Sequence, residues 1–226
     1  MQKINTFERG YTQLYTGNGK GKTTAALGLG IRALGAGLRV YIAQFLKGRD
    51  TSELNFFKQM KQIGYPIEIE QCGSPDFVYD LPSESVKQST AEQIRKIHEL
   101  FSLCHCNEQG RCTCPYDVFI LDEAIVCCTI IGMSEKDVLK DSDINKVGVQ
   151  HEIDDEIQKK QILEQSGIEL DLLELIRIKP KHVELILTGR GASNQLIEAS
   201  DLVTEMCEVK HYYNTQKVTA RIGIEI

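Results

Sequence analysis

The stretch TGNGKGKTTAALGLGIRALGAG, residues Thr16–Gly37, joins a glycine-rich loop to a helical pattern. Before it, Tyr11–Thr16 (YTQLYT) alternates like a strand, and within Lys22–Ala36 apolar residues recur at helical spacing. After it, Arg39–Leu46 (RVYIAQFL) is an apolar run typical of a strand covered on both faces. The order strand, loop, helix, strand predicts a βαβ unit.

Further strands and helices are predicted along the rest of the chain. The expected strands are Ile67–Gln71, Asp117–Leu121, Val183–Leu187 and Leu202–Thr204. Ser83 is expected to cap a helix with Ile94, Ile97, Phe101 and Cys104 on its apolar face, and Ser193 to cap one through Ala199. Strands that alternate with helices and end in polar residues predict an α/β fold of the P-loop NTPase (RecA-like) class, with a mostly parallel sheet flanked by helices.

The region Met133–Lys181 differs from the rest, because it is rich in charge and has no strand-like run. Ile168, Leu172, Leu175 and Ile176 predict that its second half is a helix on the sheet, whereas the first half is expected to be a peripheral excursion. We therefore predict one domain over residues 1–226, with a cysteine-rich loop at 104–114 and a charged helical insertion at about 134–180.

Composition excludes several classes of function. The net charge of -6 argues against general electrostatic capture of nucleic acid. No export signal and no apolar run long enough to span a membrane is found in the sequence, so we expect a cytoplasmic protein. In a reducing compartment, the eight cysteines are expected to be thiols or metal ligands before disulfides.

The glycine-rich loop predicts a phosphate site. Such a loop needs small residues so that backbone N–H groups face phosphate oxygens, a lysine for charge, and a hydroxyl for Mg²⁺. Thr16 occupies the first glycine position of the usual motif, so the loop is a variant. The predicted nucleotide-binding residues are Gly17, Asn18, Gly19, Lys20, Gly21, Lys22, Thr23 and Thr24.

An acidic pair, Asp122 and Glu123, follows the expected strand Asp117–Leu121. Asp122 and Glu123 could hold Mg²⁺ directly or through water, together with the Thr23 hydroxyl. A strand end exposed to solvent would show the same acidic pair without binding a metal.

His211 is a candidate near the site, although an isolated histidine is more often packed or solvated. No serine or cysteine with a histidine base stands out in the sequence. The chemistry is therefore expected to need no general base.

Seven blocks of sequence occur in an order that resembles the P-loop ATP:corrinoid adenosyltransferase family, which makes adenosylcobalamin. They are TGNGKGKTTAALGLGIRALGAG (Thr16–Gly37), VYIAQFLKG (Val40–Gly48), FILDEA (Phe119–Ala124), LILTGRG (Leu185–Gly191), IEASDLVTEM (Ile197–Met206), VKH (Val209–His211) and ARIGIE (Ala220–Glu225). The loop that lacks the first glycine is itself the family's form.

The resemblance implies a reaction in which a cobalt(I) corrinoid attacks the 5′ carbon of ATP and expels triphosphate, so that the protein positions reactants and stabilises leaving-group charge. It implies that Asn18–Thr24 hold the triphosphate and that Lys22 and Mg²⁺ neutralise it. Thr23 and Glu123, with Asp122, would hold the metal, and the implied catalytic residues are Lys22, Thr23 and Glu123. Arg190 is a further candidate at the nucleotide.

The resemblance also implies aromatic side chains beside the corrinoid. Phe77 and Tyr79 resemble the family's Phe-x-Trp pair with tyrosine in place of tryptophan, although ordinary core packing would explain both. A reduced flavoprotein as electron donor and a homodimer are further implications. The chain departs from the family in its short N-terminal extension, which leaves open what covers the site, and in its longer insertion.

The cysteine cluster lies outside the family pattern. Cys104, Cys106, Cys112 and Cys114 could surround one structural Zn²⁺ across the loop Asn107–Arg111. An iron–sulfur cluster and a set of free reduced thiols are the alternatives. Cys72, Cys127 and Cys128 are expected to be ordinary helix or strand thiols.

Two other functions fit the phosphate loop. A thymidine-kinase-like phosphotransferase would combine such a loop with an acidic pair and a cysteine metal clip, although it would need a base that the sequence does not supply. A non-catalytic, ATP-dependent corrinoid-binding module needs only the binding residues. The reaction products separate the three: triphosphate for adenosyl transfer, ADP for a kinase or ATPase, and none for a binder.

Overall fold

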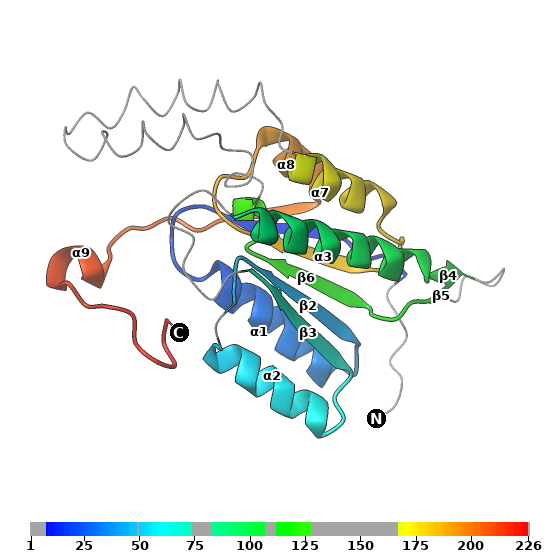
Figure 1. Ribbon diagram of the computed structural model, residues 1–226, viewed down its shortest axis with the longest axis horizontal. Helices are drawn as coiled ribbons and strands as arrows, with labels where there is room; N and C mark the ends of the chain where they lie inside the picture. The colour runs from blue at the N-terminus through cyan, green and yellow to red at the C-terminus, as the bar shows by residue number, and fades with distance from the viewer. Residues whose placement is uncertain (1–7, 49, 74–82, 107–111, 128–166, 226) are drawn as a thin grey trace.

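A computed structural model describes residues 8–48, 50–73, 83–106, 112–127 and 167–225. Its centre is a sheet of six strands in the order β3-β2-β6-β7-β1-β8, and all neighbouring strands are parallel (Figure 1). The strands are β1 (Thr12–Thr16), β2 (Val40–Phe45), β3 (Ile67–Cys72), β6 (Val118–Asp122), β7 (Glu184–Thr188) and β8 (Leu202–Glu205). The predicted parallel α/β fold is confirmed.

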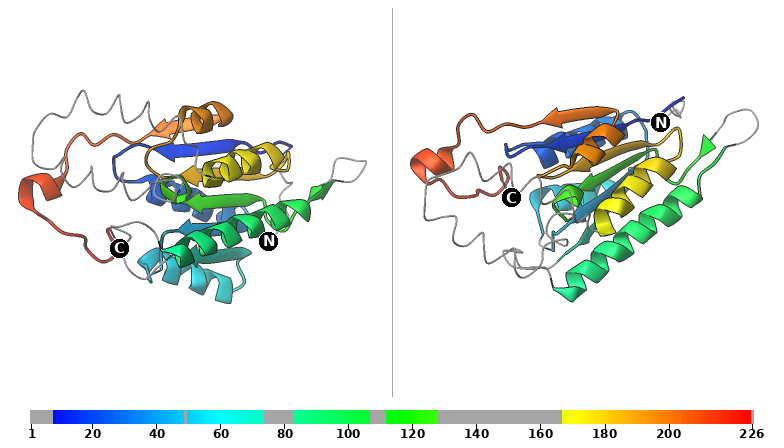
Figure 2. Two further views of the ribbon diagram at one scale, coloured as in Figure 1. Left: turned by 45° about the horizontal axis from the view of Figure 1, so that its top comes forward. Right: turned by 90° about the horizontal axis from the view of Figure 1, so that it is seen from above.

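Helices cover both faces of the sheet (Figures 1 and 2). Helices α1 (Lys22–Gly35) and α2 (Ser52–Gln62) lie on one face, and α3 (Glu84–Ser102), α7 (Gly167–Ile178) and α8 (Asn194–Ala199) lie on the other. After β8 the chain runs beyond the sheet to the short helix α9 (Tyr212–Gln216) and then turns back. A separate antiparallel pair, β4 (His105–Cys106) and β5 (Cys112–Thr113), follows α3.

The pattern of β2 explains why the centre of the sheet is buried on both faces. All of its residues are buried, and successive side chains point to opposite faces. Val40 and Ile42 pack with α1 and α2, whereas Tyr41, Ala43 and Phe45 pack with α3 and α7. The apolar run that predicted a doubly covered strand therefore supplies two separate core layers.

Most predicted elements occur within one or two residues of their expected ends. Ser193 caps α8, because its Oγ accepts a hydrogen bond from the Leu196 N–H at 3.2 Å. Ser83 occupies the N-cap position of α3, but its side chain makes no capping bond. In α7, Leu172 and Leu175 are fully buried, as the helical spacing predicted.

Within the described residues, helices α2 and α9 and the β4–β5 pair were not predicted. Helix α2 buries only Leu54 and Phe57 among polar residues, so its apolar periodicity is weak. The first half of the predicted insertion and the loop Asn107–Arg111 lie outside the described residues, and the single-domain division stays a prediction. None of the described helices is long and apolar enough to cross a bilayer.

Cys72 at the end of β3 gives a testable consequence of burial. Its thiol donates to the Gln44 carbonyl, and burial raises its pKa from 9.0 to about 12. In the native protein at pH 8 we expect a thiol reagent to modify the exposed Cys207 and leave Cys72 unmodified, as mass spectrometry of the labelled chain would measure. Rapid labelling of Cys72 would contradict this burial.

The raised pKa of Cys72 also determines how the free energy of unfolding changes with pH. Because the folded-state pKa is raised, the contribution of Cys72 is fully present below pH 9.0 and is lost as the pH rises toward about 12. The free energy of unfolding should therefore fall across this window, by at most about 1.4 kcal/mol per pH unit from this group. A Cys72→Val variant should show a shallower fall.

Candidate functional site

The phosphate loop lies where β1 meets α1, at the carboxyl edge of the parallel sheet. Gly21 is the N-cap of α1 with a left-handed backbone, φ 115°. No side chain caps this helix, and its own first turn contains no acidic residue. The N-terminus of an uncapped helix offers backbone N–H groups and a partial positive charge to an anion.

The loop passes very close to the backbone after β8. A Cβ atom added at Gly17 or Gly19 would lie 2.5 or 2.6 Å from the Met206 carbonyl oxygen, so larger residues are excluded. The Gly19 N–H donates to that oxygen at 2.6 Å, and the Met206 N–H donates to the Thr16 carbonyl at 2.8 Å. One of the amides predicted to bind phosphate is thus bonded to the chain itself.

Lys22 lies inside the loop. Its Nζ donates to the carbonyl oxygens of Gly17 at 2.7 Å and Gly19 at 2.8 Å, and only 6% of the residue is exposed. Burial lowers the pKa of Lys22, and the charge of Arg190 lowers it further. A buried ammonium held by two neutral carbonyls would gain from an anionic oxygen, which is what a phosphate would bring.

Asp122 is the centre of a hydrogen-bond network and is fully buried. Its Oδ1 accepts from the Thr23 and Thr188 hydroxyls, each at 2.8 Å. Its Oδ2 accepts from Lys47 Nζ at 2.8 Å and from Gln44 Nε2 at 3.3 Å. These bonds tie β2, β6 and β7 to the first turn of α1 and fix the orientation of the Thr23 hydroxyl.

Glu123 follows with a backbone conformation unusual for a residue with a side chain, φ 60°. Its N–H donates to the Thr188 hydroxyl at 2.9 Å, which holds this turn. Burial raises the pKa of Glu123, the charge of Asp122 adds to this, and Lys47, Lys22 and Arg190 oppose it. Across the described part of the chain, no side chain donates a hydrogen bond to the Glu123 carboxylate.

The donor set at this edge fits a hard cation. Thr23 supplies a hydroxyl already oriented by Asp122, and Glu123 supplies a carboxylate in the same charged cluster. Hydroxyl, carboxylate and phosphate oxygens are the ligands that Mg²⁺ prefers. The predicted trio Thr23, Asp122 and Glu123 is brought together, with Asp122 already hydrogen-bonded to Thr23.

Other predicted residues lie at the edge of the site or outside the described residues. Asn18, Lys20, Thr24 and Arg190 are exposed around the loop. Phe77 and Tyr79 lie outside the described residues, so their proposed contact with a corrinoid stays a prediction. His211 caps α9 by accepting a bond from the Tyr213 N–H at 3.1 Å, which accounts for it structurally.

Among the described residues at the site, the prediction missed Gln44, Lys47, Thr188 and Met206. Gln44, Lys47 and Thr188 lie at or just after the carboxyl ends of β2 and β7. The rule that polar residues at these strand ends meet at one edge could have found them. Met206 acts through its backbone, so its side-chain type gave no signal.

The end of the chain lies beside the phosphate loop. Lys20 Nζ donates to Glu225 Oε1 at 3.0 Å, and Tyr212 and Arg221 also bond to Glu225. These bonds, led by that from Arg221, hold the pKa of Glu225 well below its usual range. The segment after β8 thus contacts the phosphate loop.

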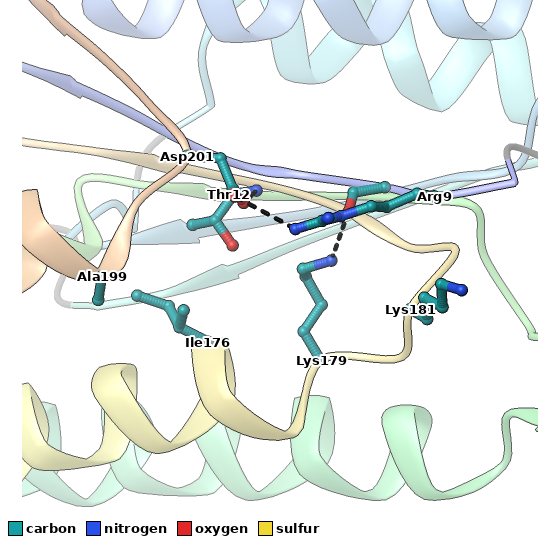
Figure 3. A pocket seen from close by; sticks show the side chains of 8 residues that line it. Arg9, Thr12, Ile176, Lys179, Lys181, Ala199 and Asp201 are labelled. Carbon is teal, nitrogen blue, oxygen red and sulfur yellow. Dashed lines mark hydrogen bonds and ion pairs between the residues drawn. The ribbon is translucent and has the colours of Figure 1, made fainter.

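A hollow at the opposite edge of the sheet is a separate feature (Figure 3). It is lined by Arg9, Gly10, Thr12, Ile176, Lys179, Lys181, Ala199 and Asp201. The Lys179 ammonium donates to the Gly10 carbonyl at 3.0 Å and the Val183 carbonyl at 2.7 Å, and Arg9 faces Asp201 at 3.7 Å. Lys179 and Arg9 thus bond to other groups of the chain, and the phosphate loop remains the candidate site.

The cysteine cluster differs from its prediction. The structure joins Cys104 and Cys114 in a disulfide, whereas we expected thiols or metal ligands. The prediction also missed His182, whose Nε2 lies 3.1 Å from the Cys114 Sγ atom. Cys106 and Cys112 pair across the β4–β5 hairpin, but their side chains are not described, so their part in a four-cysteine site stays a prediction.

Comparisons with known proteins find relatives of this chain. The sequence model described as ATP:corrinoid adenosyltransferase BtuR/CobO/CobP matches residues 8–153 and 141–226. A corrinoid adenosyltransferase of Pseudomonas aeruginosa is 30% identical over 96% of this chain and 84% of its own length. One of Escherichia coli is 27% identical, over 96% and 86%. The corrinoid adenosyltransferase CobA of Salmonella typhimurium is 26% identical over the same shares.

Proposed function

Because the chain belongs to the ATP:corrinoid adenosyltransferase family of enzymes, we propose that it transfers the 5′-deoxyadenosyl group of ATP to the cobalt of a reduced corrinoid, releasing triphosphate. In this reaction cobalt(I) supplies the electron pair of the new cobalt–carbon bond. The bond between C5′ and the triphosphate oxygen breaks, and triphosphate leaves with the electron pair of that C–O bond. The reaction serves synthesis or salvage of adenosylcobalamin.

The observation that carries the proposal is the placement of Lys22 inside a loop next to the Asp122 network. Lys22 can exchange its two carbonyl partners for oxygens of the triphosphate, whose charge increases as the C5′ bond breaks. The uncapped first turn of α1 adds N–H donors directed at the same group. Stabilisation of a leaving polyphosphate, rather than activation of a hydroxyl, is what this arrangement supports.

Magnesium fits the same oxygen-rich edge. We propose that Thr23 and Glu123 ligate it, with Asp122 orienting Thr23, and that bound Mg²⁺ would neutralise part of the phosphate charge. The residues of the chain then act by binding and positioning. Asp122 fixes the Thr23 hydroxyl, Lys47 balances the charge of Asp122, and Arg190 lies at the exposed side of the loop.

The partners are proposed on the family alone. They are the corrinoid, beside Phe77 and Tyr79, a reduced flavoprotein that supplies the electron for cobalt(I), and a second copy of the chain in a homodimer. We propose a cytoplasmic location on the same basis and do not expect nucleic acid to bind, given the net charge of -6.

One assay tests the reaction and its class together. The protein is incubated with ATP, Mg²⁺ and chemically reduced cobalamin, the cobalt absorption spectrum is followed, and the phosphate products are separated. We expect the alkylcobalamin spectrum and triphosphate in equal amounts. Formation of ADP would indicate a phosphotransferase, and a change in cobalt with no phosphate product would indicate a binding module.

A further inference from the structure

Three atoms that bind soft and borderline metals meet at the edge of the sheet opposite the phosphate loop. They are the Sγ atoms of Cys104 and Cys114 and the Nε2 atom of His182, all within 4.8 Å of one another. Cys114 and His182 are each 3% exposed, and Cys104 is partly buried against the core. Figure 1 shows the β4–β5 hairpin projecting at this edge, away from the chain after β8.

We propose that the reduced chain binds a structural Zn²⁺ through Cys104, Cys114 and His182. Two thiolates and one imidazole nitrogen are ligands that zinc prefers, and tetrahedral ligands on one zinc lie about 3.7 Å apart. The His182 Nε2 atom faces Cys114 Sγ at 3.1 Å from a segment 68 residues later in the chain.

The backbone around each ligand is already fixed, so little ordering remains for the metal to impose. The Cys104 N–H donates to the Phe101 carbonyl at 3.1 Å as α3 ends. The Cys114 carbonyl accepts from the Arg39 guanidinium, which also forms an ion pair with Asp117 at 2.6 Å. His182 lies in the turn closed by the Val183 N–H and the Pro180 carbonyl at 2.9 Å.

A metal here would join three segments of the chain, of which the first two are 10 residues apart and the third lies 68 residues later. Cys104 follows α3, Cys114 lies between β5 and β6, and His182 precedes β7. The Cα atoms of Cys104 and Cys114 are 4.3 Å apart, as in directly facing residues of antiparallel strands, so the two cysteines continue the β4–β5 ladder. Zinc would therefore clip the hairpin onto the amino end of β7 and stabilise the fold without taking part in catalysis.

The test uses the full chain, treated with a phosphine reductant and then freed of metal with a chelator. Zn²⁺ is added and measured by native mass spectrometry and by X-ray absorption at the zinc edge. We expect one zinc per chain, sulfur and imidazole nitrogen in the coordination shell, and a higher Tm with zinc than without it. The absorption experiment needs no variant and so does not depend on the folding of a mutant.

Variants then identify the ligands. His182→Ala and Cys114→Ser should weaken zinc binding more than about a hundredfold, since even groups that only hydrogen-bond to a ligand contribute about 10–100-fold. The matched controls His98→Ala, on α3, and Cys207→Ser, which is exposed, should bind zinc like the parent. The proposal is overturned if the reduced parent binds no zinc. It is equally overturned if the shell contains four sulfurs and no nitrogen and only Cys106→Ser and Cys112→Ser release the metal.

Discussion

Replacing Lys22 with alanine should lower kcat/KM for adenosyl transfer by about 10²–10³-fold, the loss measured when one preorganised charge-stabilising donor is removed from an active site. The physical reason is that the Lys22 ammonium is held within the loop, bonded to the Gly17 and Gly19 carbonyls, where water is largely excluded. Because the charge on triphosphate increases as the C5′ bond breaks, the loss should appear in kcat as well as in kcat/KM.

The measurement is the rate at which chemically reduced cobalamin becomes alkylcobalamin at saturating ATP and Mg²⁺. Lys22→Met keeps the apolar part of the side chain and removes the ammonium group, and the Tm of both variants separates a loss of chemistry from a loss of folding. Lys61→Ala is the control for loss of a lysine, since Lys61 pairs with Glu68 at the end of α2. If Lys22→Ala protein alkylated cobalamin at the parental rate, the proposed role of the loop would be wrong.

The strands and the phosphate loop could be predicted well because each is specified by a few neighbouring residues. In β2, six consecutive buried residues require helices on both faces, and no tertiary knowledge is needed to see this. The loop is equally local, since glycines at 17, 19 and 21 and a lysine at 22 specify a phosphate cradle within a few residues. Strand order is not local, and only the structure places β6 between β2 and β7.

The site was predicted in part for the same reason. Sequence motifs were enough to predict Thr23 and Asp122 as site residues. The ion pair between Lys47 and Asp122 could not be predicted in this way, because it depends on the strand register that pairs Gln44 with Asp122. His182 was missed because the zinc prediction considered residues close to one another in the sequence, and this histidine reaches the cysteines only through the β6–β7 pairing. Contacts between distant segments are what spacing cannot show.

The second large effect concerns Asp122→Asn, which should damage both stability and activity. Removing one partner of a buried ion pair costs about 3–5 kcal/mol, and because the Lys47 side chain is 23% exposed we expect about 3. In a chain of this size that is a fall in Tm of about 6–12 °C. Activity should fall about 10–100-fold, because Thr23 loses the carboxylate that orients its hydroxyl.

Two further variants separate the effects. Lys47→Met combined with Asp122→Asn should cost less stability than the sum of the two single changes, since the double variant leaves no unpaired buried charge. Asp117→Asn is the matched control, because Asp117 is also buried and paired, with Arg39, but lies at the opposite edge of the sheet. It should lower the Tm and leave the rate per folded molecule unchanged. Equal rates for Asp122→Asn and Asp117→Asn, measured well below both melting temperatures, would show that the Asp122 network supports the fold alone and has no part in holding the triphosphate and its metal.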